Sequence, residues 1–178
     1  QVHSLIVTPQ LLQLLLLAAE KNWQPPSSLQ FVAVGGGKVA QPLLSKALAL
    51  GIPVFEGYGL SECASVVSLN TSQQYQPASV GQPLAQLQLS IEQGEVVVAG
   101  NCMLGYANES ASWYPRKIYT GDLGSIDARG FLQINGRKKN LLISSYGRNI
   151  NPEWPESELL ANNAIAECVV FGDAQPYC

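Results

Sequence analysis

The stretch QFVAVGGGKVAQPLLSKALALGIPVFEGYG, residues 30–59, decides the fold class of this chain. Residues 30–34 are mostly apolar and stop at a run of three glycines, residues 35–37, which is typical of a buried strand followed by a turn. Residues 39–50 have the length and composition of a helix, and residues 52–55 predict a second strand. A strand, a helix and a strand in this order are typical of an α/β layer with parallel strands.

The residues before this stretch continue the same alternation. Residues 4–7 predict a strand, and Thr8 followed by Pro9 predicts the start of a helix, because a threonine hydroxyl caps free N–H groups and proline has no N–H to leave unpaired. The predicted helix runs to about Lys21 and is apolar on nearly all sides, so we expect it to be buried. Residues 1–65 are therefore expected to form an α/β layer.

The pattern changes at about Val66, where short apolar segments separated by Gly, Pro, Asn and Asp favour antiparallel β structure. These segments are residues 87–91, 95–98, 124–126 and 131–134, with a hairpin turn at residues 127–130. Residues 141–144 then predict a strand, residues 152–162 a helix and residues 166–171 a final strand. The expected fold class is α/β, with mixed α+β structure towards the C-terminus.

Composition excludes several classes of function. A formal net charge of −3 gives no basic surface for nucleic acid. The four cysteines form no CxxC pair and His3 is the single histidine, so neither a Cys/His metal site nor a histidine-dependent catalytic pair is expected. The apolar run at residues 11–19 is too short to span a bilayer. We therefore expect no transmembrane segment and a cytoplasmic location, with peripheral membrane association left open.

Three glycine-bearing segments follow predicted strands, and these are residues 35–37, 57–62 and 119–122. Each alone is typical of an ordinary turn, but ligands bind at the carboxyl ends of strands in open α/β sheets. The polar residues of these segments suit a nucleotide. Tyr58 offers a face for stacking, Ser61 a hydroxyl for phosphate, Glu62 an oxygen ligand for Mg²⁺ and Asp122 a carboxylate for ribose.

Four longer motifs stand in a fixed order, namely GYGLSEC (57–63), GEVVVAGNCMLGY (94–106), YTGDLGSID (119–127) and GRKKNLLISSYGRNINPEWPE (136–156). Together they resemble the motifs of the adenylate-forming, AMP-binding superfamily, with Ser61 where the family usually has threonine. The last motif is most similar to that of long-chain fatty-acid and other acyl-CoA synthetases. The resemblance implies that residues 1–138 are the C-terminal part of the large domain. It also implies that residues 139–178 are the hinge and the beginning of the small C-terminal domain.

The resemblance implies an ATP-dependent acyl-CoA synthetase. A fatty or other carboxylic acid reacts with ATP to give acyl-AMP and pyrophosphate, and CoA then displaces AMP. The implied cofactors and co-substrates are ATP, Mg²⁺ and CoA. The nucleotide-binding residues implied are Gly36, Gly37, Gly57, Tyr58, Gly59, Ser61, Asp122 and Arg137.

Individual roles follow from the same resemblance. Tyr58 would stack on adenine, Ser61 would contact the α-phosphate and Glu62 would hold Mg²⁺. Asp122 and Arg137 would bind the ribose hydroxyls.

The resemblance also assigns two residues to the later half of the reaction. Lys139, with Ser61 and Glu62, completes the implied catalytic set as the hinge about which the small domain rotates. Gly147 would lie beside the channel for the pantetheine arm of CoA.

The candidate site residues also have other interpretations. Tyr58 suits a core aromatic residue, Asp122 a turn, and Lys138 with Lys139 a solvated charge run. For the whole protein, the alternatives are transfer of the acyl group to a carrier protein or a reductase, or a truncated nucleotide-binding module.

The chain departs from the family pattern in two main places. The Ser/Thr/Gly-rich phosphate-binding loop with its lysine is missing, and so is the catalytic lysine near the family's C-terminus. Both ends read as cut, so we expect a fragment that is inactive by itself. Its exposed strand edges are a route to self-association.

Overall fold

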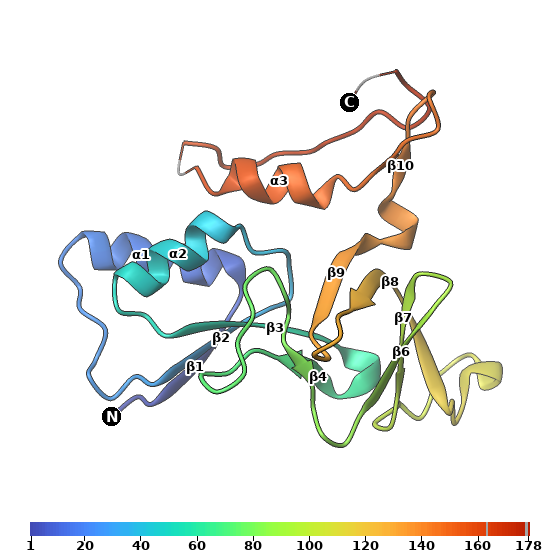
Figure 1. Ribbon diagram of the computed structural model, residues 1–178, viewed down its shortest axis with the longest axis horizontal. Helices are drawn as coiled ribbons and strands as arrows, with labels where there is room; N and C mark the ends of the chain where they lie inside the picture. Colours follow the sequence, from blue (N-terminus) through green and yellow to red (C-terminus); the bar gives the residue numbers. More distant parts are fainter. Residues whose placement is uncertain (163, 177) are drawn as a thin grey trace.

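Three parallel strands and two helices form the N-terminal layer of the computed structural model, which describes residues 1–162, 164–176 and 178 (Figure 1). The elements are β1 (Ser4–Val7), α1 (Pro9–Glu20), β2 (Phe31–Val34), α2 (Gln41–Ala49) and β3 (Val54–Leu60). Strand β2 pairs in parallel with both β1 and β3. The predicted α/β alternation is confirmed.

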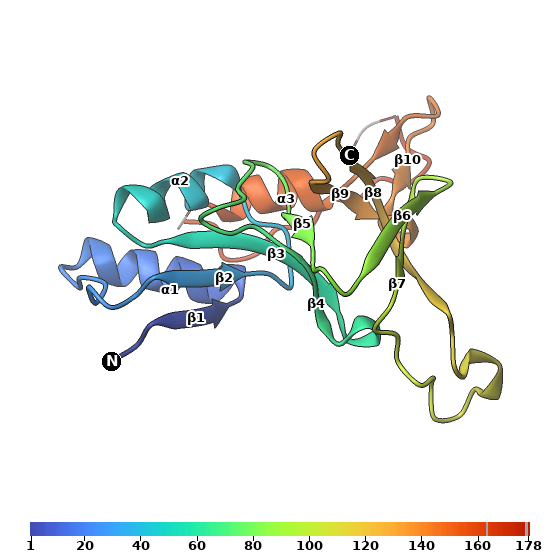
Figure 2. The ribbon, with the colours of Figure 1, turned by 60° about the horizontal axis from the view of Figure 1, so that its bottom comes forward.

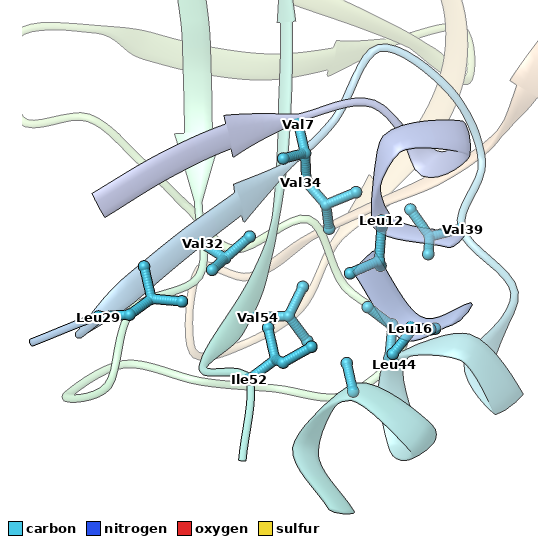
Figure 3. Close-up of a cluster of buried hydrophobic side chains, with 11 residues drawn as sticks. Val7, Leu12, Leu16, Leu29, Val32, Val34, Val39, Leu44, Ile52 and Val54 are labelled. Atoms are coloured by element: carbon cyan, nitrogen blue, oxygen red, sulfur yellow. The ribbon is translucent and has the colours of Figure 1, made fainter. Parts of the chain in front are cut away.

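The local signals of the sequence explain how the helices begin. Thr8 precedes α1 in extended conformation, and its hydroxyl oxygen accepts a hydrogen bond from Leu11 N. Both helices carry proline in their first turn, where the missing N–H costs nothing. Both lie on one face of the sheet, and side chains from the strands and helices meet in an apolar core (Figure 3). That core includes Leu12, Leu16, Val32 and Val54.

Two further strands extend this sheet beyond the parallel part, namely β4 (Ser65–Leu69) and β5 (Gln82–Pro83). They pair antiparallel, in the order β1-β2-β3-β4-β5. Our expectation that the strand ends at Gly57 and turns is wrong, because residues 57–60 continue β3 and pair with β4. The strand direction changes near residue 66 as predicted, but β4 and β5 still belong to the first sheet.

A second sheet of four antiparallel strands follows, in the order β6-β7-β8-β9 (Figure 2). Its strands are β6 (Gln88–Glu92), β7 (Glu95–Ala99), β8 (Lys117–Ile126) and β9 (Leu132–Arg137). The predicted antiparallel segments and the turn after β8 are confirmed. The expected turn at residues 119–122 is wrong, because these residues lie inside the ten-residue strand β8. A buried apolar cluster lies between this sheet and residues such as Cys63 and Val67.

The C-terminal segment leaves β9 through a short 3₁₀ turn, η3 (Lys138–Asn140). A small hairpin of β10 (Leu142–Ile143) and β11 (Asn149–Ile150) follows, and then helix α3 (Glu153–Leu160). Figures 1 and 2 both show α3 lying near α1 and α2, and Gln13 Nε2 donates to Leu160 O at 3.5 Å.

Two predictions for this segment need correction. Only two residues of the expected strand 141–144 pair with a neighbour, because the chain turns back at once to β11. Residues 166–171 form no strand. Val170 N–H donates instead to the Glu156 side chain, and the neighbouring Val169 and Phe171 are 77% and 78% exposed. Within the described residues, no helix has the length and the apolar run that crossing a membrane requires.

Candidate nucleotide site

The centre of the site is a chain of contacts that joins Tyr58, Asp122 and Arg137. Tyr58 stands on β3, Asp122 on β8 and Arg137 on β9, so three strands from two sheets contribute. The Tyr58 hydroxyl donates to Asp122 Oδ2 at 2.6 Å. Arg137 Nε lies 2.9 Å from Asp122 Oδ1, and the two residues are directly paired in the β8–β9 register.

The surroundings of Tyr58 keep its hydroxyl protonated. Burial raises the pKa of Tyr58, and the hydrogen bond to Asp122 raises it further, so the hydroxyl stays protonated and acts as a donor. Asp122 is only 5% exposed, and its carboxylate is matched by the arginine. Thr120 Oγ1 accepts from the Asp122 N–H and donates to Val96 O, which fixes the backbone beside the carboxylate.

A positively charged hollow opens beside this group, lined by Gly121, Arg137, Lys138 and Lys139. The carboxylate of Glu95 on β7 supports it. Glu95 Oε1 accepts from Gly121 N–H at 2.8 Å, and Glu95 Oε2 lies 3.3 Å from Lys138 Nζ. The hollow is therefore rich in cationic donors, which suits a phosphate-bearing or otherwise anionic ligand.

Ser61 and Glu62 lie in a short 3₁₀ turn, η1 (Ser61–Cys63), directly after β3. Ser61 is exposed and Glu62 is half-buried. The Tyr106 hydroxyl donates to Glu62 Oε1 at 2.9 Å, and Met103 N–H donates to Glu62 O at 2.7 Å. Two contacts from residues 103–106 thus fix the position of the Glu62 backbone and side chain.

The glycines of β3 are required by close packing against β4. A Cβ at Gly59 would lie 1.4 Å from Ser65 O, a distance that no side chain tolerates. A Cβ at Gly57 would lie 2.8 Å from Leu69 Cδ1. These two glycines therefore have a structural reason that is independent of any ligand.

The glycine loop after β2 lies beside the start of this motif. A Cβ at Gly35 would lie 3.0 Å from Gly57 O, so the two segments are in contact. Gly36 has a φ of +82° and open space where a side chain would be, whereas a Cβ at Gly37 would touch Pro9. The loop therefore leaves an exposed backbone surface next to the β3 motif.

The three glycine-bearing segments picked out by the sequence therefore meet in space. Gly35 contacts Gly57, and Tyr58 bonds to Asp122. Lys139 lies in η3 at the edge of the cationic hollow. Gly147 lies apart from this group, in the turn of the β10–β11 hairpin, with a φ of +72° and open space around it.

The oxygen atoms of Glu62 suit a cation that is bound together with a ligand. Within residues 1–162, 164–176 and 178, no three His, Cys, Asp or Glu side chains gather as a metal site. Glu62 supplies carboxylate oxygen, and Mg²⁺ is commonly held by one or two carboxylates together with substrate phosphates. Glu62 therefore fits magnesium that arrives with a nucleotide.

Sequence reasoning missed three residues. Glu95 and Tyr106 belong to the motif at residues 94–106, but only the fold brings them to Gly121 and Glu62. Glu56 had a local signal, a charged residue at the end of an apolar strand. It is 8% exposed, its Oε2 has no hydrogen-bond partner, and burial raises its pKa to about 7.

Comparison with known protein families gives a match over residues 1–106 to the family described as AMP-binding enzyme. The 2-succinylbenzoate–CoA ligase of Bacillus mycoides is 37% identical over 166 residues, covering 84% of this chain and 34% of that protein. The long-chain-fatty-acid–CoA ligase FadD15 of Mycobacterium bovis is 37% identical over 137 residues, covering 71% of this chain and 22% of its own. The chain spans about a third of the length of the first of these relatives.

Comparison with solved structures gives the same kind of relative. The O-succinylbenzoate CoA synthetase of Bacillus subtilis, in complex with ATP and magnesium, superposes with a TM-score of 0.80 at 33% identity, covering 93% of this chain and 38% of that one. The same enzyme with the acyl-adenylate OSB-AMP gives 0.81. Matched family motifs and a shared fold lead to one conclusion: the chain belongs to the AMP-binding enzyme family.

Proposed function

We propose that the protein containing these residues is an AMP-forming acid–CoA ligase. In the first half-reaction, a carboxylate oxygen of the acid attacks the α-phosphorus of ATP, and pyrophosphate leaves. In the second, the CoA thiol attacks the acyl carbon, and AMP leaves. A carboxylate is a poor acyl donor until its oxygen belongs to a good leaving group, which is what adenylation supplies.

The observation that carries this proposal is the Tyr58–Asp122–Arg137 group beside a cationic hollow. A carboxylate oxygen has two lone pairs, and each Asp122 oxygen uses one of them, Oδ2 for Tyr58 and Oδ1 for Arg137. One lone pair on each oxygen is left for the two hydroxyls of a ribose. We propose that Asp122 and Arg137 bind these hydroxyls and that the ring of Tyr58 stacks on adenine, bordered by Gly36, Gly37, Gly57 and Gly59.

Glu62 and Ser61 are proposed to act at the phosphates. Tyr106 occupies one lone pair of Glu62 Oε1 and fixes the carboxylate, which leaves Oε2 for a Mg²⁺ that ATP brings. Magnesium would neutralise phosphate charge as pyrophosphate leaves. Ser61 is proposed to donate to the α-phosphate, and its exposure at the start of η1 supports this role.

The remaining assignments concern the second half-reaction. We propose that residues 1–138 belong to the large domain and that residues 139–178 begin the small one. Lys139 would be the hinge, because it lies in the exposed turn that leaves β9. Gly147, with open space where a side chain would stand, would border the path of CoA.

The acid is proposed to be an aryl or fatty acid, with 2-succinylbenzoate as the first candidate. Its support is the identity of 37% to the 2-succinylbenzoate–CoA ligase over most of this chain. The sequence motifs favoured fatty acids, and the match to a long-chain-fatty-acid–CoA ligase covers less of the chain. The cytoplasmic location stays a prediction.

We further propose that the 178-residue stretch does not adenylate by itself. Neither of the two lysines that family members use against phosphate charge has a counterpart here. The support for this is the share of the relative's length that the chain spans, about a third.

The test uses the full-length protein, with ATP–pyrophosphate exchange for the first half-reaction and CoA-dependent AMP release for the second. We expect both with 2-succinylbenzoate or with palmitate. Asp122→Asn should lower kcat/KM for ATP about tenfold or more, since hydrogen bonds to charged groups contribute about 1.5–3 kcal/mol. Glu109→Gln, at an exposed site, serves as the control.

Three outcomes would count against the proposal. Exchange without CoA-dependent AMP release would favour a carrier-protein or reductase acceptor. AMP binding without exchange would favour a non-catalytic module. Exchange by the isolated 178-residue stretch would overturn its proposed inactivity.

A further inference from the structure

Cys63 and Cys102 are brought together by the backbone. Glu62 O accepts a hydrogen bond from Met103 N–H at 2.7 Å. The acceptor belongs to the peptide group between Glu62 and Cys63, and the donor belongs to the peptide group between Cys102 and Met103. Each cysteine Cα is bonded directly to one of these two peptide groups. Covalent geometry therefore holds the two Cα atoms within about 8 Å of each other, close to the separation of about 4.4–6.8 Å that disulfides have.

The side chains also share one environment. Cys63 is 1% exposed in the apolar cluster beneath the second sheet, and Cys102 packs against the same cluster while half-buried. Both cysteines therefore contact one apolar cluster from neighbouring positions of the backbone, which brings the two side chains into the same region of the fold.

We propose that Cys63 and Cys102 form a reversible disulfide under oxidising conditions, and that this bond restrains Glu62. Cys102 is half-buried and has solvent access, so it reacts first, whereas Cys63 is buried out of reach of an oxidant in solution. Cys63 is thus the resolving partner.

The chemistry balances with a peroxide as the oxidant. The Cys102 thiolate attacks one oxygen of hydrogen peroxide, and the O–O bond breaks to give a sulfenic acid and hydroxide. The Cys63 sulfur then attacks the Cys102 sulfur, the S–O bond breaks, and the Cys63 proton leaves with the hydroxyl as water. Two thiols are oxidised, and one peroxide is reduced to two waters.

The bond would act on Glu62 through residues 102–106. Tyr106 already bonds to Glu62 Oε1, and Met103 to Glu62 O. A disulfide one residue from each backbone contact would hold this segment against the Glu62 carboxylate and hinder its rearrangement around a cation. This second part rests on the proposed function of Glu62.

Tryptic mapping isolates the pair, because residues 47–115 contain no Lys or Arg and Cys63 and Cys102 are the two cysteines of the peptide 47–116. The full-length protein is treated with hydrogen peroxide, alkylated and digested without reductant. We expect this peptide to lose about 2 Da and to escape alkylation, and dithiothreitol to reverse both changes. Cys102→Ser and Cys63→Ser should each abolish this loss of mass. Cys63→Ala replaces Cys63→Ser if the serine variant fails to fold.

The control is the Cys168→Ser, Cys178→Ser double variant, which should still form the bond. Conversion of Cys102 to a sulfinic acid, or a disulfide from Cys102 to another cysteine, would overturn the site. To test the restraint on Glu62, ATP–pyrophosphate exchange is measured before and after oxidation. The exchange rate should fall severalfold on oxidation and recover with dithiothreitol, whereas oxidation should not change the rate of the Cys102→Ser variant. A disulfide that leaves exchange unchanged would overturn the restraint on Glu62, whereas absence of exchange in the reduced protein would instead overturn the proposed function.

Discussion

The Tyr58 hydroxyl donates to Asp122 Oδ2 at 2.6 Å, across 64 residues of sequence. Tyr58 belongs to the first sheet and Asp122 to the second. The bond therefore connects the two sheets at the place where the proposed nucleotide site lies. Any change in how the sheets sit against each other would move the tyrosine ring away from the carboxylate, so we expect the binding of nucleotide and the packing of the sheets to be coupled.

Tyr58→Phe tests this connection. The variant keeps the ring for stacking but removes the donor, and it leaves one oxygen of a buried carboxylate without its partner. We expect a loss of stability of about 1–3 kcal/mol and a weaker affinity for AMP. Urea unfolding and an AMP titration on the full-length protein measure the two effects.

The matched control is Tyr114→Phe, because Tyr114 is 75% exposed. It should change stability by less than about 0.5 kcal/mol. If Tyr58→Phe behaves like this control in both measurements, the hydrogen bond does not connect the sheets in solution.

Glu56 makes stability depend on pH. Its pKa rises from 4.5 to about 7, mainly by burial, while the charge of Lys38 and a hydrogen bond from Gln41 act in the opposite direction. The folded protein thus holds a proton that the unfolded chain releases between these two values. The contribution of Glu56 to stability is greatest below pH 4.5, falls as pH rises towards 7, and is lost above it, by about 3 kcal/mol in all.

Glu56→Gln removes this titration while keeping an oxygen that accepts from Gln41. We expect the variant to be more stable than the parent at pH 8 and close to it at pH 5, in urea unfolding. Glu109→Gln, at an exposed site, should show no such difference between the two pH values. Equal pH slopes in Glu56→Gln and in the parent would mean that the buried carboxyl does not titrate in this range.

Glu95 is expected to position the cationic hollow. Glu95→Gln keeps an acceptor for Gly121 N–H but loses the charge facing Lys138, whereas Glu95→Ala loses both. We expect a cost of about 1–3 kcal/mol for the alanine variant, because the amide loses its partner, and less than about 1 kcal/mol for the glutamine variant, because Lys138 is exposed.

The loss of AMP affinity should likewise be larger in Glu95→Ala than in Glu95→Gln. Glu92→Ala is the control on the neighbouring strand β6, since Glu92 pairs with the partly exposed Lys117. An equal loss of AMP affinity in Glu92→Ala and Glu95→Ala would count against a special role for Glu95.

The elements that the sequence predicted are those with local signals. Helix α1 has a capping threonine, a first-turn proline and a continuous apolar run, and β2 is an apolar segment that ends at glycine. The strand β3 could not be bounded in this way. Its last four residues are extended because β4 pairs with them, and nothing in Gly57 to Leu60 itself shows that partner.

In the candidate site, too, some features could be predicted from sequence motifs and others depend on the tertiary fold. The resemblance pointed to Tyr58, Asp122 and Arg137, and the fold brings the three together. The contacts of Glu95 and Tyr106 with residues 26 and 44 positions away depend on how the second sheet folds, so no local pattern predicts them.

Gly59→Ala is expected to disrupt the β3–β4 pair. The added Cβ would lie 1.4 Å from Ser65 O, which belongs to the backbone and cannot move aside without breaking the strand pairing. We expect a loss above about 4 kcal/mol or failure to fold. Gly37→Ala is the matched control, because its Cβ would make an ordinary 3.5 Å contact with Pro9, and circular dichroism melting should place it near the parent.

Lys139→Pro tests the proposed hinge between the two proposed half-reactions. Proline fixes φ near −65° and restricts the residue before it, so it opposes backbone rotation in η3 while leaving Tyr58, Asp122 and Arg137 unchanged. We expect ATP–pyrophosphate exchange to stay within about threefold of the parent and CoA-dependent AMP release to fall at least about tenfold, as for a step limited by domain rotation. Lys139→Ala removes the charge and keeps the rotation, so it should preserve both rates far better. Equal loss of both half-reactions in the proline variant would place the hinge elsewhere, because a rotation needed only for thioester formation cannot slow the step before it.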